Sequence, residues 1–340
     1  MVDGELLVLD DNGLHCPRGG FYIDPWRPVN TAVLSHAHAD HARPGSAAYH
    51  CAAPSTSLIR ARLGTDVAIT AHAYRESFRI KEVEVTFFPA GHVLGSAQIR
   101  LRAAGSPTAV VTGDFKREDD PTCESFEPVT CDTLVTEATF ALPVYRFQPT
   151  AWVVEEILAW WRGNAERASM VFCYALGKSQ RLLAELARRW GRSRPGPIYC
   201  HGAVAAVNRV YAEAGVELPE WEEMGDRRGE DLAGSLIVAP PSAHRSPWMK
   251  RASRPATAFC SGWMAVRGAR RRRGYERGFV LSDHADWDGV LRTVRESGAA
   301  RVLVTHGQNE VLARYLREER GLDAQALATL YAGEEDGDKA

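Results

Sequence analysis

The sequence lacks the features of membrane and disulfide-bonded proteins. No apolar run approaches the roughly 20 residues that a membrane span requires. Its seven cysteines are scattered, and no two of them form a C-x-x-C pair, so neither a disulfide framework nor a cysteine-based zinc ribbon is indicated. The first residues also lack a signal-peptide pattern, and we therefore expect a cytoplasmic protein.

Lysine is scarce as well, because only five of the 41 basic residues are Lys. A GC-rich genome is one explanation for this bias, and phosphate recognition by the planar guanidinium group is another. The arginines cluster most densely at Arg267, Arg270, Arg271, Arg272, Arg273 and Arg277. This cluster is either a solvated loop or a track that binds the phosphates of a nucleic acid.

The most distinctive stretch of the sequence is a cluster of three imidazoles and one carboxylate: His36, His38, Asp40 and His41. It follows residues 31–34, a short apolar run that predicts a buried strand. Neutral imidazoles and carboxylates are the ligands that suit zinc, manganese and iron. One metal ion cannot easily use all four groups of so short a segment, so the cluster predicts two adjacent metal ions.

Other strand-like runs also end in residues that can bind a metal or transfer a proton. Including the run before His36, these end residues are His36, His92, Asp114, Glu137 and His306. Because sites in open sheets form beyond the ends of the strands, we expect these side chains to meet at one edge. Asp24 also ends an apolar run, and it is either a carboxylate that orients a ligand or a simple turn residue before Pro25.

Residues 150–275 alternate between helix-like and strand-like segments, which predicts a small parallel α/β unit. Within it, Gly177-Lys178-Ser179 resembles the end of a phosphate-binding loop. The motif would need Gly at position 172, where the chain has Phe, so we reject a Walker motif. We interpret this stretch as a helix start, with Lys178 facing a nucleic-acid substrate.

The residue types favour hydrolysis of a phosphodiester by two metal ions. Asp114 suits a carboxylate that bridges the two ions. The leaving oxygen then needs a proton donor, and His284, oriented by Glu137, suits this role. His284 belongs to a second His/Asp cluster, residues 281–286.

The pattern His36-x-His38-x-Asp40-His41, followed by His92 and Asp114, resembles the signature of the metallo-β-lactamase fold. The resemblance implies an α/β protein with a four-layer αββα sandwich. It also implies two divalent ions, Zn²⁺ or Mn²⁺. The first ion would be bound by His36, His38, His92 and Asp114, and the second by Asp40, His41, Asp114 and His306. Asp24 would support these ligands.

Three further motifs, at residues 136–139, 282–286 and 305–307, resemble those of the β-CASP nuclease branch. The resemblance implies a core of residues 1–149 plus 276–340 and an inserted β-CASP domain of residues 150–275. Its implied catalytic residues are Asp40, Asp114, Glu137 and His284. Residues 20–25, 261–268 and 281–287 are similar to the ligase-associated DNA exonucleases of bacteria.

The first hypothesis is therefore a metal-dependent DNA exonuclease that acts in repair beside an ATP-dependent DNA ligase and a helicase. His306 leaves an RNA-processing nuclease as the alternative hypothesis, because RNA-processing members of this branch have His at the third of these motifs. A third hypothesis is a nucleic-acid-binding protein with a purely structural metal site. Structural zinc sites mostly use Cys, and the absence of Cys from this cluster disfavours that hypothesis.

The arginine cluster generates a test of its own. We expect that replacing Arg270, Arg271 and Arg272 with Ala weakens the binding of all nucleic-acid sequences alike. The slope of log K against log salt concentration should flatten by roughly 0.7–0.9 per lost phosphate contact. An unchanged slope in a salt titration would identify the cluster as a solvated loop.

Overall fold

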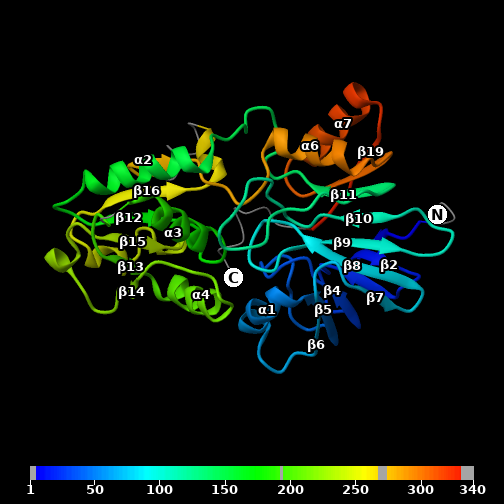
Figure 1. The fold of residues 1–340 in the computed structure, drawn as a ribbon, viewed down its shortest axis with the longest axis horizontal. Coiled ribbons are helices and arrows are strands. Elements are labelled where there is room, and N and C mark those ends of the chain that lie inside the picture. Colours follow the sequence, from blue (N-terminus) through cyan, green and yellow to red (C-terminus); the bar gives the residue numbers. More distant parts are fainter. Residues whose placement is uncertain (1–4, 192–193, 267–273, 331–340) are drawn as a thin grey trace. The chain divides into compact units, whose positions relative to one another are not determined.

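The computed structural model describes residues 5–191, 194–266 and 274–330 (Figure 1). The chain forms two compact units: the first contains residues 5–143 and 284–330, and the second contains the described part of 144–283. The boundaries predicted from the sequence are 149/150 and 275/276. In the structure, strand β17 (Arg277–Phe279) pairs with β16 (Ala256–Cys260) of the second unit.

The first unit contains two sheets. The first sheet has the order β1-β2-β3-β4-β5-β6, and its strands are β1 (Val8–Asp10), β2 (Gly13–Cys16), β3 (Phe21–Ile23), β4 (Thr31–Val33), β5 (Ala48–Ala52) and β6 (Ile69–His72). The second sheet has the order β19-β18-β11-β10-β9-β8-β7, and its strands are β19 (Asp323–Ala326), β18 (Arg301–Thr305), β11 (Thr133–Glu137), β10 (Ala109–Val111), β9 (Ala97–Arg102), β8 (Val83–Pro89) and β7 (Ser77–Ile80).

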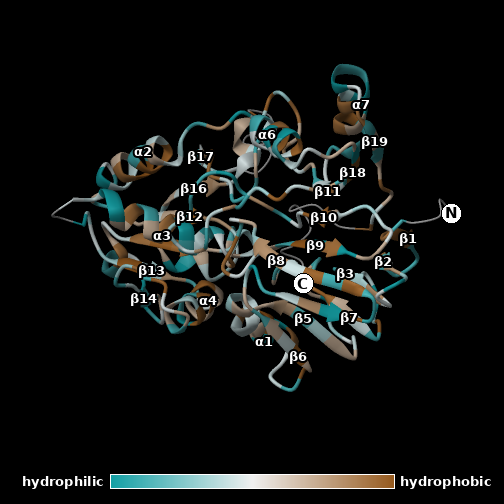
Figure 2. Ribbon diagram, turned by 45° about the vertical axis from the view of Figure 1, so that its right-hand side comes forward, coloured by the Kyte–Doolittle hydropathy of each residue, from teal (hydrophilic) through white to brown (hydrophobic). Residues whose placement is uncertain are grey.

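A hydrophobic core joins the two sheets. Alternate residues of a strand point to opposite faces, so Phe21 and Ile23 of β3 pack with Phe87 of β8 and Ile99 of β9. Figure 2 shows hydrophobic residues along β9 and β10. On its other face, the second sheet packs against helices α6 (Trp287–Ser297) and α7 (Asn309–Arg320). Helix α1 (Thr56–Leu63) follows β5 and buries Leu58 and Ile59.

The second unit contains one parallel sheet, which confirms the predicted α/β character of this segment. Its order is β14-β13-β15-β12-β16-β17, with the remaining strands β14 (Glu222–Glu223), β13 (Ile198–Cys200), β15 (Leu236–Ala239) and β12 (Ser169–Phe172). One face is covered by helices α2 (Thr150–Arg162), α3 (Lys178–Arg189) and α4 (Gly202–Glu213). None of the helices in the described ranges is long and apolar enough to cross a membrane.

The structure places Lys178 differently from the sequence prediction. Lys178 begins α3 and is fully buried, with its Nζ 3.0 Å from Oδ1 of Asp283 and 4.4 Å from the ring centre of Tyr174. A buried ammonium that is paired with a buried carboxylate is unsuited to a surface contact with a phosphate. The predicted arginine cluster, at 267 and 270–273, lies outside the described residues.

Candidate metal centre

The strand directions of the first unit bring the predicted site residues together. Strand β8 runs parallel to β10, because both are antiparallel to β9, and β10, β11 and β18 are parallel neighbours. Their carboxyl ends therefore meet at one edge of the sheet. The residues at or just beyond these ends are His92, Asp114, Glu137 and His306. The loop after β4 joins this edge, since the carbonyl of Ser35 accepts a hydrogen bond from Ala97 N–H at 2.8 Å.

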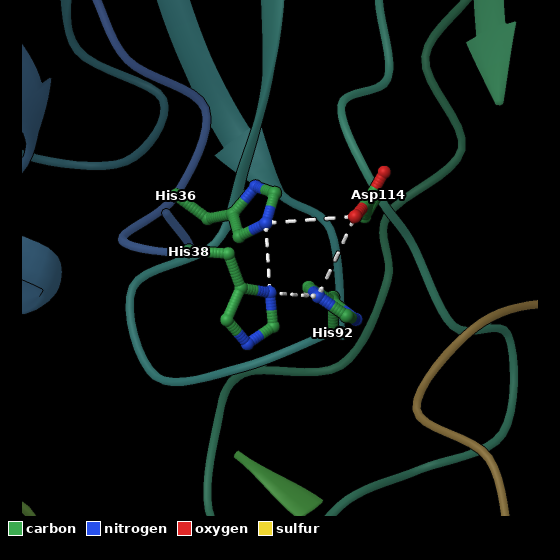
Figure 3. A group of neighbouring side chains, drawn as sticks. All are labelled: His36, His38, His92 and Asp114. Carbon is green, nitrogen blue, oxygen red and sulfur yellow. Dashed lines mark hydrogen bonds and ion pairs between the residues drawn. The ribbon is translucent and has the colours of Figure 1, made fainter. Parts of the chain in front are cut away.

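Four side chains form the first group of candidate metal ligands: His36, His38, His92 and Asp114 (Figure 3). Nδ1 of His38 lies 3.0 Å from Nε2 of His36 and 3.1 Å from Nε2 of His92. Oδ2 of Asp114 lies 3.5 Å from Nε2 of His36 and 3.9 Å from Nε2 of His92. Ligand atoms around a tetrahedral zinc ion are separated by roughly 3.3 Å, so this group matches the ligand spacing of a single ion.

A second group consists of Asp40, His41 and His306. Nε2 of His41 lies 3.7 Å from Oδ2 of Asp40, and the rings of His41 and His306 stack at a centroid distance of 5.0 Å. Oδ2 of Asp114 is also 3.5 Å from Nε2 of His41. The same oxygen therefore lies beside an imidazole of each group, which is the position of a bridging carboxylate.

The chemistry of the donor set fits divalent cations. Asp114 is buried, and its Oδ1 has no hydrogen-bond partner among the residues that the structure describes. A buried carboxylate is costly unless charge or hydrogen bonds compensate it, and a divalent cation would supply that charge. All seven candidate ligands are imidazoles or carboxylates, which is the set that suits zinc and manganese.

Asp24, which the sequence predicts as either a carboxylate that orients a ligand or a turn residue, contacts the candidate ligand His41. Its Oδ2 lies 2.8 Å from Nδ1 of His41 and accepts the hydroxyl of Ser35 at 2.5 Å, while its Oδ1 accepts the Ser35 N–H at 2.8 Å. A carboxylate only accepts hydrogen bonds, so Nδ1 of His41 carries the hydrogen and Nε2 faces the second group. Asp24 has a φ of 44°, a strained conformation of the kind that concentrates at functional sites.

His306 also has a left-handed backbone, with a φ of 53°. It follows β18 directly, and its Nδ1 lies 2.8 Å from the hydroxyl of Thr305, so Nε2 is the ring nitrogen available to a metal. The next residue, Gly307, has a φ of 61°, and a Cβ there would lie 2.5 Å from the carbonyl oxygen of Ala138. Only glycine fits this close approach, which holds His306 against the end of β11.

Glu137 connects the candidate proton donor to the loop of the bridging carboxylate. Its Oε1 accepts the backbone N–H of Phe115 at 2.7 Å, directly after Asp114. Its Oε2 accepts the hydroxyl of Thr139 at 2.6 Å and lies 2.8 Å from Nδ1 of His284. The hydrogen of the His284 ring is therefore on Nδ1, and Nε2 turns away from Glu137. This is the arrangement that orients an imidazole for proton transfer.

The electrostatics differ between the imidazoles. Burial lowers the pKa of His36 well below its ordinary value, and repulsion from His41 adds to this effect, so His36 is neutral and can bind a metal. Burial also lowers the pKa of His306. For His41, burial acts in the same direction, but the carboxylates, led by Asp114, outweigh it and raise the pKa well above its usual range. Burial opposes the charge of Asp114, but the neighbouring His41 and His284 lower its pKa well below the ordinary value.

Several residues that support the site were not predicted from the sequence. Ser35 and Thr139 each hold a carboxylate, and Thr305 holds His306. Each stands one or two residues from a predicted site residue, but hydroxyl side chains are common at strand ends. Their roles depend on three-dimensional contacts that a one-dimensional pattern does not contain.

The fold and site define a mixed α/β protein with several sheets and a candidate metal centre. The chain is 32% identical over 322 residues to "Probable DNA ligase" of Opitutus terrae, a match that covers 93% of this chain and 30% of that protein. It is 30% identical over 234 residues to "Endoribonuclease ysh-1" of Neurospora crassa, a match that covers 55% of this chain and 27% of that protein. It is 32% identical over 149 residues to "Cleavage and polyadenylation specificity factor subunit 3" of Dictyostelium discoideum, a match that covers 41% of this chain and 19% of that protein.

The chain thus spans less than a third of the length of these curated relatives. No protein-family model matches it. Among solved structures, it is similar to a crystal structure of a protein of unknown function from Enterococcus faecalis, with a TM-score of 0.56 and 11% identity over 81% of this chain and 74% of that chain. At this identity, the similarity supports the fold alone.

The contacts of Asp24 predict its effect on metal binding. We expect Asp24→Asn to weaken the binding of the metal ion at His41 by about 10- to 100-fold, because partners that orient a ligand contribute that much to metal affinity. Competition with a chelating dye would measure the affinity for zinc. Asp11→Asn, at an exposed residue of the same charge, is the matched control and should leave the affinity unchanged. Equal affinities in the two variants would show that Asp24 does not orient His41.

Proposed function

We propose that this chain is a two-metal phosphodiesterase of the metallo-β-lactamase fold and the β-CASP nuclease branch. The observation that carries this proposal is the single oxygen of Asp114 that lies 3.5 Å from an imidazole of each ligand group. The relatives are named as a probable DNA ligase, an endoribonuclease and a cleavage and polyadenylation specificity factor subunit, and these names support nucleic acid as the substrate. In this proposal, the second unit is the inserted β-CASP domain.

The two groups would hold one divalent ion each, with Asp114 shared between them. When bound, such ions activate water for attack on the phosphorus and stabilise the charge on the phosphoryl oxygens. The chain's own residues then position the reactants. His36, His38 and His92 hold one side of the centre, while Asp40, His41 and His306 hold the other.

His284 would donate the proton that the leaving oxygen requires. Glu137 holds one hydrogen on Nδ1, so the doubly protonated ring would give its second proton to the leaving oxygen from Nε2. Glu137 in turn accepts hydrogen bonds from Thr139 and from the Phe115 N–H. The donor and the bridging carboxylate are thereby held in one rigid arrangement, as proton transfer over a short distance requires.

Within this class, we favour a DNA exonuclease over an RNA-processing nuclease. The relative whose name refers to DNA matches 93% of the chain, whereas the endoribonuclease matches 55%. Because this chain corresponds to part of a protein named as a DNA ligase, we also propose that it acts together with a ligase in bacterial DNA repair. The presence of His306 at the third extra motif favours the alternative, an RNA-processing nuclease.

The proposal is tested with purified chain, loaded with zinc or manganese, on DNA and RNA strands of matched sequence labelled at either end. We expect stepwise shortening of the DNA from one end. Asp114→Asn should lose nearly all hydrolysis while strand binding, measured by gel shift, mostly survives, because only the bridge is altered. Full turnover by the metal-loaded variant would contradict the assignment of Asp114, and internal cuts in RNA alone would select the alternative.

The role of His284 can be separated from metal binding by the choice of leaving group. We expect His284→Ala to slow the hydrolysis of a DNA strand by about 10²- to 10⁴-fold, with the metal content unchanged. A p-nitrophenyl phosphodiester should lose much less rate, because p-nitrophenolate leaves without a proton. Equal losses on both substrates, or loss of a metal ion, would show that His284 has another role.

A further inference from the structure

The first unit contains a polar cavity of about 550 Å³ that the metal centre does not use. It is lined by side chains from β2, β3 and the loops around them, and its polar members are Asn12, His15, Tyr22 and Asn30. Its volume falls in the usual range for pockets that bind small molecules. Tyr22 lies on β3 between Phe21 and Ile23, which are buried in the core between the sheets, so Tyr22 points to the opposite face.

The cavity contains a flat pair of rings. His15 and Tyr22 are cross-strand neighbours in β2 and β3, and their rings stack at a centroid distance of 4.3 Å with an interplanar angle of 9°. The Tyr22 hydroxyl donates to Oδ2 of Asp10 at 2.9 Å, and Nδ1 of His15 lies 3.4 Å from the same oxygen. The other Asp10 oxygen accepts the Asn12 N–H at 2.8 Å. One carboxylate therefore fixes both rings and the adjoining turn.

We propose that this cavity binds a nucleobase of the nucleic-acid strand, an inference that rests on the proposed function. Planar side chains bind bases by stacking, and side-chain amides such as those of Asn12 and Asn30 form paired hydrogen bonds with base edges. Within the described residues, no Arg or Lys lines the cavity, so its interior is suited to a base and not to a phosphate.

A cation lies at the rim instead. Gly20 also lines the cavity, and a Cβ on it would be 2.4 Å from Nζ of Lys81, so the missing side chain leaves room for this ammonium. Lys81 is exposed and can meet the phosphate of the same nucleotide. The cavity and the metal centre lie near opposite ends of β3, since Gly20 of the cavity precedes this strand and Asp24 follows it.

The test measures nucleoside binding to the full, metal-loaded chain. Adenosine and cytidine are the probes, ribose is the control without a base, and ligand-detected NMR or calorimetry gives the affinities. We expect the nucleosides to bind and ribose not to bind. Tyr22→Ala should weaken nucleoside binding by roughly 5- to 150-fold, the equivalent of one stacked base, whereas Tyr22→Phe should stay within about threefold because it keeps the ring.

Circular dichroism would check that each variant is folded. Should Tyr22→Ala fail to fold, Asn30→Ala replaces it, and we expect a loss of about tenfold from the missing amide. The proposal is overturned when ribose binds as well as adenosine, when neither nucleoside binds at millimolar concentration, or when folded variants bind like the unaltered chain. Hydrolysis of DNA and RNA strands is measured in parallel. A chain that hydrolyses strands without binding nucleosides lacks the base pocket, and a chain that binds nucleosides without hydrolysing strands lacks the proposed nuclease activity.

Discussion

The buried carboxylate of Asp114 is the interaction on which the rest of the candidate centre depends. One of its oxygens lies at equal distances, 3.5 Å, from imidazoles of the two ligand groups. It can occupy this position because Gly113, just before it, has a φ of 57° and a Cβ there would lie 2.6 Å from Cβ of Ser35. The loops that follow β4 and β10 thus approach each other closely beside the residue that the two ligand groups share.

The surrounding groups are arranged to keep this charge in place. The carboxylates of Asp24 and Glu137 each accept hydrogen bonds from a backbone N–H, a hydroxyl and an imidazole. These two sets of contacts have the same composition although they come from different sheets. Each carboxylate fixes the orientation of one imidazole ring and the position of its Nδ1 hydrogen, as metal binding and proton transfer require.

Much of the site could be predicted from the sequence because its residues stand at the ends of short apolar runs. The runs before His36, His92, Asp114, Glu137 and His306 correspond to β4, β8, β10, β11 and β18. Because parallel strands end at the same edge of a sheet, the position of these residues after apolar runs was enough to predict that their side chains meet. The alternation of helices and strands in residues 150–275 was predicted from the hydrophobic periodicity of the sequence.

Other parts could not be predicted, for physical reasons. Burial of a charged side chain depends on a partner that is distant in sequence, so the pairing of Lys178 with Asp283 was not visible and Lys178 was predicted to face the nucleic-acid substrate. The supporting hydroxyls of Ser35 and Thr139 act through single hydrogen bonds with no periodic signal. The ring pair of His15 and Tyr22 forms across two strands, and only their register reveals it.

The pairing of β11 with β18 has a consequence for how the chain folds. These neighbouring parallel strands lie on opposite sides of the entire second unit in the sequence. During synthesis, the second unit is complete before β18 emerges, so it can fold while the first unit still lacks an interior strand. The second sheet of the first unit must then pair β18 with β11 across a long insertion that is already folded, a non-local step that slows folding. Until that step occurs, His306 is absent from the centre, so the candidate metal site is among the last parts of the molecule to form.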